Sequence, residues 1–307
     1  VKGDAREARA IREVIVSSGS INSPKLLELS GIGRPELLKK HGIDVVHELP
    51  GVGESLRDHY SPRMKYAISE KNATFSERGT GLRLIGEAMK YAFFRKGFIA
   101  LSTVPLRMYF RTREGLESPD ETISFMPFLT ERVNRARVIS KQPGVTMNVN
   151  VLRSESLGSI HIKSADPEIA PAIRFNFLSA EMDRTGVLYA MRKGRELMGT
   201  LPVAGIVSKE IAPGADLQSD EELLEWVRNN AETTYHPVGT CKMGSDPMAV
   251  VDDNLRVHGI DGLRVADASI MPTLTSGNTN APSIMIGEKC AIMVLAAAEA
   301  TDSKAAA

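Results

Sequence analysis

The fold of this chain starts from the stretch Glu13-Val-Ile-Val-Ser-Ser-Gly-Ser-Ile-Asn-Ser-Pro-Lys-Leu-Leu-Glu-Leu-Ser-Gly-Ile-Gly33. Its first six residues are rich in β-branched side chains, which predicts a buried strand, and Gly19 predicts the turn that follows. Ser23 is the expected N-cap of a helix with Pro24 at its first position. Leucines then give this helix an apolar face that stops at Ser30-Gly31. The stretch therefore predicts a strand, a glycine turn and a short helix in succession.

The next residues predict a helix followed by a strand. Residues 34–41 form a second helical pattern that ends at Gly42. Residues 43–49 read as another strand, which runs into Pro50-Gly51-Val52-Gly53. The first 53 residues therefore predict strand, helix, helix, strand.

The rest of the chain gives weaker signals up to about residue 145 and clearer ones after it. Residues 145–152 and 159–164 both alternate at period two, which predicts a hairpin in an antiparallel sheet. Periodicity predicts helices at 82–95, 180–199, 220–230 and from Pro282 to about Glu299, and a strand at 122–129. Residues 98–110 read as a loop, and the tail after Glu299 is expected to fray.

Composition and charge exclude several classes of protein. The 307 residues include 38 basic and 38 acidic side chains and give a pI near 7.2, so nucleic acid is not an expected partner. Only Cys241 and Cys290 could form a disulfide, and the N-terminus does not resemble a signal peptide. The apolar stretches are too short or too interrupted to predict a transmembrane segment. The expected location is the cytoplasm, and the alternative is peripheral association with the inner membrane.

Common catalytic motifs are absent from the sequence. It contains no phosphate-binding Gly-x-x-x-x-Gly-Lys, no His-Glu-x-x-His, no Cys-x-x-Cys and no Gly-x-Ser-x-Gly. Gly31-Ile-Gly33 and Gly51-Val-Gly53 each supply two of the three glycines of a dinucleotide fingerprint. The histidines are scattered, so no metal site is expected.

Two dense segments near the C-terminus could carry chemistry. Thr233-Thr-Tyr-His-Pro-Val-Gly-Thr-Cys-Lys-Met-Gly244 holds His236 against a proline that restricts the backbone. The segment 266–283 combines a strand end, a polar turn with Asn278 and Asn280, and Pro282 at a helix start that suits an anion. Each segment also has a purely structural interpretation, as a turn with a hydrogen-bonded imidazole and as a turn with a helix cap. Residue chemistry alone leaves both interpretations open.

Taken together, the separated motifs resemble the glucose-methanol-choline (GMC) family of FAD-dependent oxidoreductases. Gly19–Gly33 is similar to the second signature of that family, and Leu49-Pro-Gly-Val-Gly-Glu-Ser-Leu-Arg-Asp-His59 is similar to the stretch that follows it, with Ser55 where Asn is usual. Residues 235–244 and 250–272 resemble the C-terminal part of the family. Within the family, these motifs look most like bacterial alcohol dehydrogenases that act on aliphatic alcohols, with choline dehydrogenases more distant.

The resemblance implies a reaction and a set of site residues. FAD would accept hydride from an alcohol carbon, and an aldehyde would leave. The catalytic pair would be His236, as the general base, and Asn278, as a hydrogen-bonding partner of the hydroxyl. The implied FAD contacts are Gly19, Ser23, Asp267, Ala268, Asn278 and Thr279. The partners would be a small alcohol and an electron acceptor, either a quinone or oxygen.

The family pattern also implies an architecture. The expected fold is α/β, with residues 1–60 and 233–300 in the FAD domain, an α+β substrate domain at 61–232 built on an antiparallel sheet, and a disordered tail at 301–307. The chain departs from the pattern in lacking a Gly-x-Gly-x-x-Gly loop, which predicts that the N-terminal Rossmann-like half is missing and that this fragment alone binds FAD weakly or not at all. Two alternatives remain open, which are a non-redox member such as a hydroxynitrile lyase and an inactive fragment.

Overall fold

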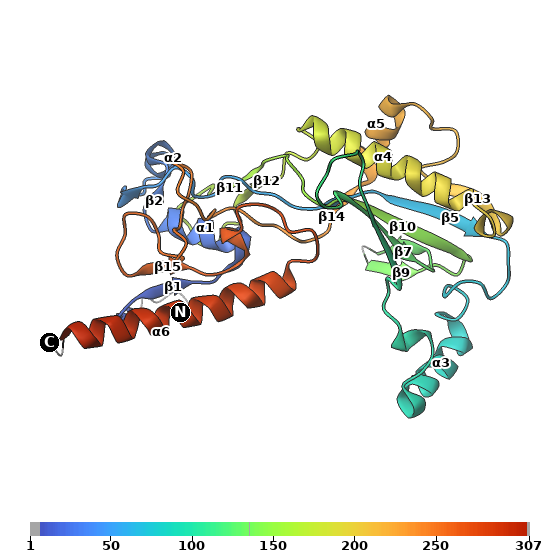
Figure 1. Ribbon diagram of the computed structural model, residues 1–307, viewed down its shortest axis with the longest axis horizontal. Coiled ribbons are helices and arrows are strands. Elements are labelled where there is room, and N and C mark those ends of the chain that lie inside the picture. The colour runs from blue at the N-terminus through green and yellow to red at the C-terminus, as the bar shows by residue number, and fades with distance from the viewer. Residues whose placement is uncertain (1–6, 135, 306–307) are drawn as a thin grey trace. The chain divides into compact units, whose positions relative to one another are not determined.

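The computed structural model describes residues 7–134 and 136–305 and divides into two compact units (Figure 1). Unit 1 consists of the residues up to Asp58, residues 154–179 and the residues from Tyr235 onward. Unit 2 consists of residues 59–153 and 180–234. Residues 154–179 therefore pack with unit 1, although the expected substrate domain at 61–232 includes them.

Unit 1 is a mixed α/β unit around a short parallel sheet. Strand β1 (Val14–Val16) pairs in parallel with β15 (Leu263–Val265), although nearly 250 residues separate them in the chain. Helix α1 (Gly19–Leu29) follows β1, and the long helix α6 (Asn280–Ala305) ends the unit. The remaining elements of the unit are β2 (Ile32–Gly33), α2 (Pro35–Lys40), β3 (His47–Glu48), β11 (Ser159–His161), β12 (Ala172–Arg174) and η3 (Ala268–Ile270). The sequence predicted strand, helix, helix, strand over the first 53 residues. Both helices and both outer strands are present, but the prediction missed the short strand β2 between the helices.

Helix α1 begins five residues earlier than the sequence predicts. Ser23 is therefore not an N-cap, and Pro24 lies inside the helix. A proline has no N–H for the carbonyl of residue i−4, which here belongs to Ser20. That carbonyl instead accepts a hydrogen bond of 2.6 Å from the Thr240 hydroxyl. The helix tolerates Pro24 because a distant segment satisfies the carbonyl that proline leaves unpaired.

The core of unit 1 joins residues from both ends of the chain. Val16 and Leu27 pack with Val265, Ile270 and the other members of one buried apolar cluster. Helix α6 contributes Ile286 and Cys290, which are 5% and 4% exposed. Burial of this apolar surface holds α1, η3 and α6 in one unit.

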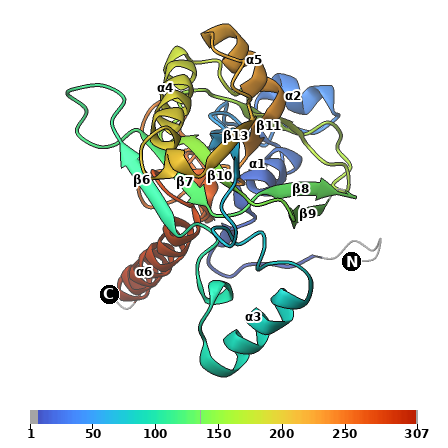
Figure 2. The same cartoon turned by 90° about the vertical axis from the view of Figure 1, so that its right-hand side faces the viewer.

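Unit 2 is built on a five-stranded antiparallel sheet in the order β13–β5–β10–β7–β6. Helix α4 (Glu181–Met198) packs on the sheet, and Figure 2 shows it beside β7 and β10. The strands of the sheet are β5 (Arg63–Ile68), β6 (Leu106–Phe110), β7 (Glu121–Met126), β10 (Gly144–Val151) and β13 (Val207–Ala212). The other elements are β4 (Tyr60–Ser61), α3 (Gly81–Phe94), η1 (Phe98–Ala100), β8 (Thr130–Val133), β9 (Ala136–Ile139), η2 (Val203–Gly205), α5 (Asp220–Asn230) and β14 (Glu232–Thr233).

Three further local predictions are wrong. Residues 145–152 and 159–164 do not form a hairpin, because β10 lies between β5 and β7 while β11 pairs with β12 in the other unit. Residues 106–110, expected in a loop, form the edge strand β6. Helix α6 continues to Ala305, into the tail that was expected to be disordered, because the residues after Glu299 include neither glycine nor proline to end it. Residues 306–307 lie outside the described part of the chain.

In the described part of the chain, one helix meets the length and composition of a membrane span, although the sequence predicts no transmembrane segment. It is the part of α6 from Asn280 to Glu299, with a mean hydropathy of 1.5 over a window that is 11% buried. Its inner side packs in the unit 1 core through Ile286 and Cys290. Length and composition alone are weak evidence for a span, because a core helix satisfies the same criteria.

Candidate functional site

The loop that carries His236 is fixed on both sides by backbone hydrogen bonds. Cys241 N–H donates to the Ser269 carbonyl at 2.9 Å, and Met243 N–H donates to the Ile270 carbonyl at 2.8 Å. On the other side, Arg57 and Val238 exchange a pair of backbone hydrogen bonds of 2.9 and 3.0 Å. The loop therefore lies between residues 56–58 and helix η3, all within unit 1.

The predicted catalytic pair lies together in this structure. The Asn278 side-chain Nδ2 is 3.1 Å from His236 Nε2, although 42 residues separate the two in the chain. An amide nitrogen can only donate, so in this arrangement His236 Nε2 is the acceptor and carries a lone pair. His236 is half-buried and Asn278 is exposed. A small molecule that replaces the hydrogen bond between the two side chains would therefore meet one acceptor, on His236, and one donor, on Asn278.

The backbone around His236 is constrained. Tyr235 has a φ of 63°, in the left-handed region that costs a non-glycine residue about 1–2 kcal/mol. His236 N–H donates to the Asp58 carboxylate at 2.9 Å, and Asp58 is only 1% exposed. A buried carboxylate thus holds the main chain at the residue after the strained one, a pattern that occurs at functional sites.

A second cluster joins the start of α1 to the residue before η3. The Asp267 carboxylate accepts hydrogen bonds from Gly19 N–H at 3.0 Å and from the Ser23 hydroxyl at 2.5 Å. Its other oxygen accepts from Ser269 N–H at 2.7 Å. A negative charge at a helix N-terminus is stabilised by the helix dipole. Asp267 therefore clamps the strand end of β15 to the first turn of α1.

The residues expected to contact FAD lie in both clusters. Gly19, Ser23 and Asp267 contact one another, and the Ala268 carbonyl accepts from Gly239 N–H in the His236 loop at 3.4 Å. The Thr279 carbonyl accepts from the backbone and hydroxyl of Ser283 in the first turn of α6. The structure thus brings all of the predicted site residues into unit 1.

The first turn of α1 leaves room for polar groups of a cofactor, although the Asp267 carboxylate already accepts the Gly19 N–H. Gly19 has a φ of 79°, and a Cβ added there would meet nothing within 4 Å. The hydroxyl oxygen of Ser20 is buried and has no hydrogen-bond partner among the described residues. A helix start with an open glycine and an unpaired buried hydroxyl suits phosphate or sugar oxygens. Within residues 7–134 and 136–305, no group of three or more His, Cys, Asp or Glu could hold a metal ion.

Sequence reasoning missed two residues that support the site. Asp58 lies in the quoted stretch 49–59, but no spacing rule relates it to a residue 178 positions later. Thr240, which bonds the Ser20 carbonyl, is likewise in a quoted motif without an assigned role. Pro24 could have indicated that a residue such as Thr240 is needed. A proline inside a helix leaves the carbonyl four residues earlier without its N–H partner, so another group must donate to that carbonyl.

A third polar cluster lies at the end of α1. His161 Nδ1 is 2.6 Å from a Glu28 oxygen, and its Nε2 is 3.0 Å from a Glu54 oxygen. The second Glu28 oxygen accepts from Ile162 N–H at 2.8 Å, and the Glu28 side chain is fully buried. Arg34 pairs with Glu54. Burial opposes the charged imidazole, but the hydrogen bonds to the two glutamates outweigh it and raise the pKa of His161 to about 9.

Two family models match the chain, and both describe GMC oxidoreductases. The N-terminal model matches residues 2–61 and the C-terminal model matches residues 154–287. The second match includes His236 and Asn278. The GMC family binds FAD, and the structural neighbours include FAD-dependent members.

Individual relatives agree with this assignment. An oxygen-dependent choline dehydrogenase of Brucella anthropi is 41% identical over 292 residues, which are 94% of this chain and 52% of the relative. One from Cronobacter sakazakii is 43% identical over 287 residues, 93% of this chain and 51% of the relative. The chain thus spans about half the length of the curated relatives it matches.

Solved structures give the same result. A formate oxidase superposes with a TM-score of 0.83 at 27% identity, over 94% of this chain and 54% of the other. A fungal aryl-alcohol oxidase gives a TM-score of 0.78 at 25% identity, over 92% and 54%. The sequence motifs, the fold and the relatives of this chain thus all show that it belongs to the GMC oxidoreductase family.

Proposed function

We propose that this chain carries the alcohol-oxidising residues of an FAD-dependent GMC dehydrogenase or oxidase. The observation that carries the proposal is the distance of 3.1 Å between Asn278 Nδ2 and His236 Nε2. An oxygen atom placed about 2.9 Å from both nitrogens would lie within hydrogen-bond distance of each. An alcohol hydroxyl can donate to His236 and accept from Asn278 at the same time.

In this proposal, His236 removes the hydroxyl proton at Nε2. The lone pair that faces Asn278 is the one that would receive the proton. Asn278 orients the oxygen and stabilises the negative charge that grows on it, but its amide cannot accept the proton in place of His236. FAD, when bound, supplies the acceptor for the hydride of the carbinol carbon.

The FAD-binding role belongs to the same proposal. Gly19 and the Ser20 hydroxyl would contact the cofactor at the start of α1, with the Ala268 backbone beside them. Asp267 and Ser23 would hold that helix start in place, since the carboxylate already accepts three hydrogen bonds. Asn278 and Thr279 would face the flavin at the start of α6, where backbone N–H groups favour negative charge. The substrate-binding role expected for residues 61–232 stays a prediction.

The test measures flavin reduction by alcohols in the absence of oxygen. The chain is loaded with FAD, in the presence of a co-expressed N-terminal GMC segment, and mixed with a panel of primary alcohols while the flavin absorbance is recorded. We expect His236→Ala to slow bleaching by about 10²- to 10⁴-fold, as loss of a general base does. His41→Ala, which alters the half-buried C-cap residue of α2 and leaves His236 and Asn278 unchanged, serves as the control.

Two results would contradict the proposal. An His236→Ala protein that still bleaches at the wild-type rate would exclude His236 as the base. A wild-type protein that binds FAD but bleaches with no alcohol would favour a non-redox acid–base reaction on the same pair.

A further inference from the structure

Helix α4 covers one face of the unit 2 sheet, and the opposite face is polar. Met64 and Met147 point towards α4, because a Cβ added to Gly194 of that helix would lie 3.0 Å from the Met64 sulfur and 2.8 Å from Met147 Cε. Side chains alternate between the two faces along a strand, so the residues next to these methionines point away from α4. On β5, β6, β7 and β10, no position on this opposite face holds Asp or Glu. We call one part of it the polar face, formed by Arg107, Tyr109, Thr122, Ser124, Asn148 and Asn150.

The strand register aligns these side chains in two rows across the sheet. Arg107 on β6 lies opposite Ser124 on β7, which lies opposite Asn148 on β10. The adjacent row consists of Tyr109, Thr122 and Asn150. Directly opposite residues in an antiparallel sheet are about 5 Å apart, so neighbours in a row can contact the same small molecule.

Two amide oxygens on the polar face have no hydrogen-bond partner. Asn148 Oδ1 and Asn150 Oδ1 are both buried, and no described residue donates to either of them. Buried acceptors in native proteins are normally paired, because an unpaired one keeps the cost of its lost hydration. The two residues lie two positions apart on β10 and therefore on the same face. Their oxygens suit the hydroxyl groups of a bound molecule, which can donate to them.

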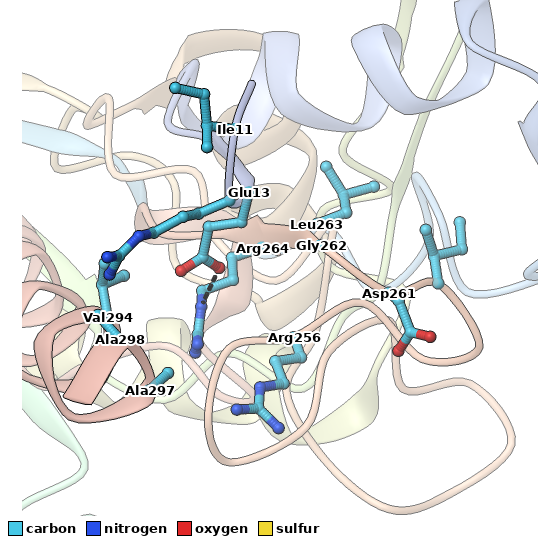
Figure 3. Close-up of a pocket in the computed structure, with 12 residues that line it drawn as sticks. Ile11, Glu13, Arg256, Asp261, Gly262, Leu263, Arg264, Val294, Ala297 and Ala298 are labelled. Carbon is cyan, nitrogen blue, oxygen red and sulfur yellow. Dashed lines mark hydrogen bonds and ion pairs between the residues drawn. The ribbon is translucent and has the colours of Figure 1, made fainter. Parts of the chain in front are cut away.

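The Arg107 guanidinium contacts only neutral groups among the described residues. Its Nε donates to the Ser124 hydroxyl at 2.9 Å, and its Nη1 donates to the Tyr109 hydroxyl at 3.4 Å. The buried Arg264 of unit 1 differs, because it forms an ion pair of 2.6 Å with Glu13 at the edge of a pocket of about 390 Å³ (Figure 3). A guanidinium has five N–H donors in a planar fork that fits a carboxylate. Arg107 thus has both the charge and the donors to hold an anion.

We propose that the polar face binds a small hydroxy acid, with its carboxylate on Arg107 and a hydroxyl on Asn148 or Asn150, and that such an acid is the alcohol substrate of this chain. The assignment rests on the proposed function, to which it adds the charge of the substrate. A quaternary ammonium alcohol such as choline needs aromatic rings or carboxylates around its cation. The polar face offers one aromatic ring, that of Tyr109, together with a positive charge. Selection of an anion therefore follows from the same residues that disfavour a cation.

The test compares three probes of similar size and different charge. Glycerate, glycerol and choline are titrated into the 307-residue chain by calorimetry. We expect glycerate to bind about 10- to 100-fold more tightly than glycerol, as a charged hydrogen-bonded pair provides, and choline to bind more weakly than glycerol. Hydrogen exchange should slow with glycerate at residues 106–110 and 144–151.

Variants of one arginine test the charge selection. Arg107→Gln should lower the affinity for glycerate by about 10- to 100-fold and leave that for glycerol unchanged. Arg107→Lys keeps the charge without the planar fork and should retain part of the preference. Arg111→Gln is the matched control, because it removes the same charge from a side chain that donates to the Glu117 carbonyl beyond the end of β6.

An asparagine variant tests the hydroxyl contact. Asn148→Leu should weaken binding of both glycerate and glycerol. It should also raise the urea midpoint of the ligand-free protein, because it removes a buried oxygen that has no donor. An asparagine with a purely structural role would give the opposite change in the midpoint.

Four results would overturn the proposal. They are choline binding at least as tight as that of glycerate, an equal effect of Arg107→Gln and Arg111→Gln, no binding of any of the three probes, and an Arg107→Gln chain that keeps its affinities but self-associates. The last result would make Arg107 a charge that protects the edge strand β6 from pairing. The titrations need neither FAD nor His236, so they fail or succeed separately from the flavin bleaching that tests the proposed function.

Discussion

Replacing His161 by glutamine should make unit 1 less stable, and the loss should depend on pH. The imidazole lies between the Glu28 and Glu54 carboxylates at 2.6 and 3.0 Å, and its side chain is 15% exposed. The rise of its pKa from 6.5 to about 9 corresponds to about 3 kcal/mol of stabilisation of the charged form in the folded protein. Glutamine keeps one donor for the pair but cannot carry the charge.

The sign of the pH dependence follows from the raised pKa. The folded protein binds the His161 proton more tightly than the unfolded chain does, so the stabilisation is complete below about pH 6.5 and disappears as pH rises through about 9. The difference in unfolding free energy between wild type and His161→Gln should therefore be about 3 kcal/mol at pH 6 and should shrink steadily towards pH 10.

Hydrogen exchange measured by mass spectrometry gives the unfolding free energy of unit 1 separately from that of unit 2. Peptides from α1 report on unit 1, while the fluorescence of Trp226 reports on unit 2, which should not respond. His41→Gln is the control for loss of a histidine outside the cluster. A difference that is the same at pH 6 and pH 10, or an equal effect of His41→Gln, would refute the assignment of the charge to His161.

Two further predictions concern buried carboxyl groups. Burial, with Asp120 and Asp183 nearby, raises the pKa of Glu121 well above its usual value, so the folded state keeps a proton that the unfolded chain loses above about pH 4.5. Stability of unit 2 should therefore fall as pH rises from 5 to 8, and Glu121→Gln should flatten this slope in urea unfolding followed by Trp226 fluorescence; an unchanged slope would be the contrary result. Asp58→Ala removes the acceptor of His236 N–H and should lower the rate of flavin reduction by about 10- to 100-fold while FAD affinity stays constant, as measured by FAD titration and anaerobic mixing; a wild-type rate would exclude a positioning role.

Local patterns in the sequence predicted local structure well. The β-branched run before Gly19 became β1, and the apolar periodicities at 180–199 and 220–230 became α4 and α5. The capping box at Ser219 and Glu222 fixes the start of α5. These features depend only on residues that are close together in the chain, so they can be predicted from a single sequence.

Long-range partners account for the errors. Period-two alternation marks β10 and β11 as strands, but it does not state which strands they pair with, and they belong to different units. Serine is a preferred N-cap residue, yet the Ser23 hydroxyl donates to Asp267, which lies 244 residues later in the chain. The pairing of His236 with Asn278 could be expected from the family resemblance, whereas the supporting contact from Asp58 could not be derived from spacing.

The way in which the two units share the chain has a consequence for handling the protein. Unit 1 is assembled from three stretches of chain and unit 2 from two, so the polypeptide passes from one to the other four times. No uninterrupted piece of the chain consists of one unit alone, and a single proteolytic nick at one crossing would leave the two units covalently joined at the other three. Native contacts such as those between β1 and β15 must wait until most of the chain has been made, which favours slow folding and makes late-forming intermediates the stage most exposed to aggregation.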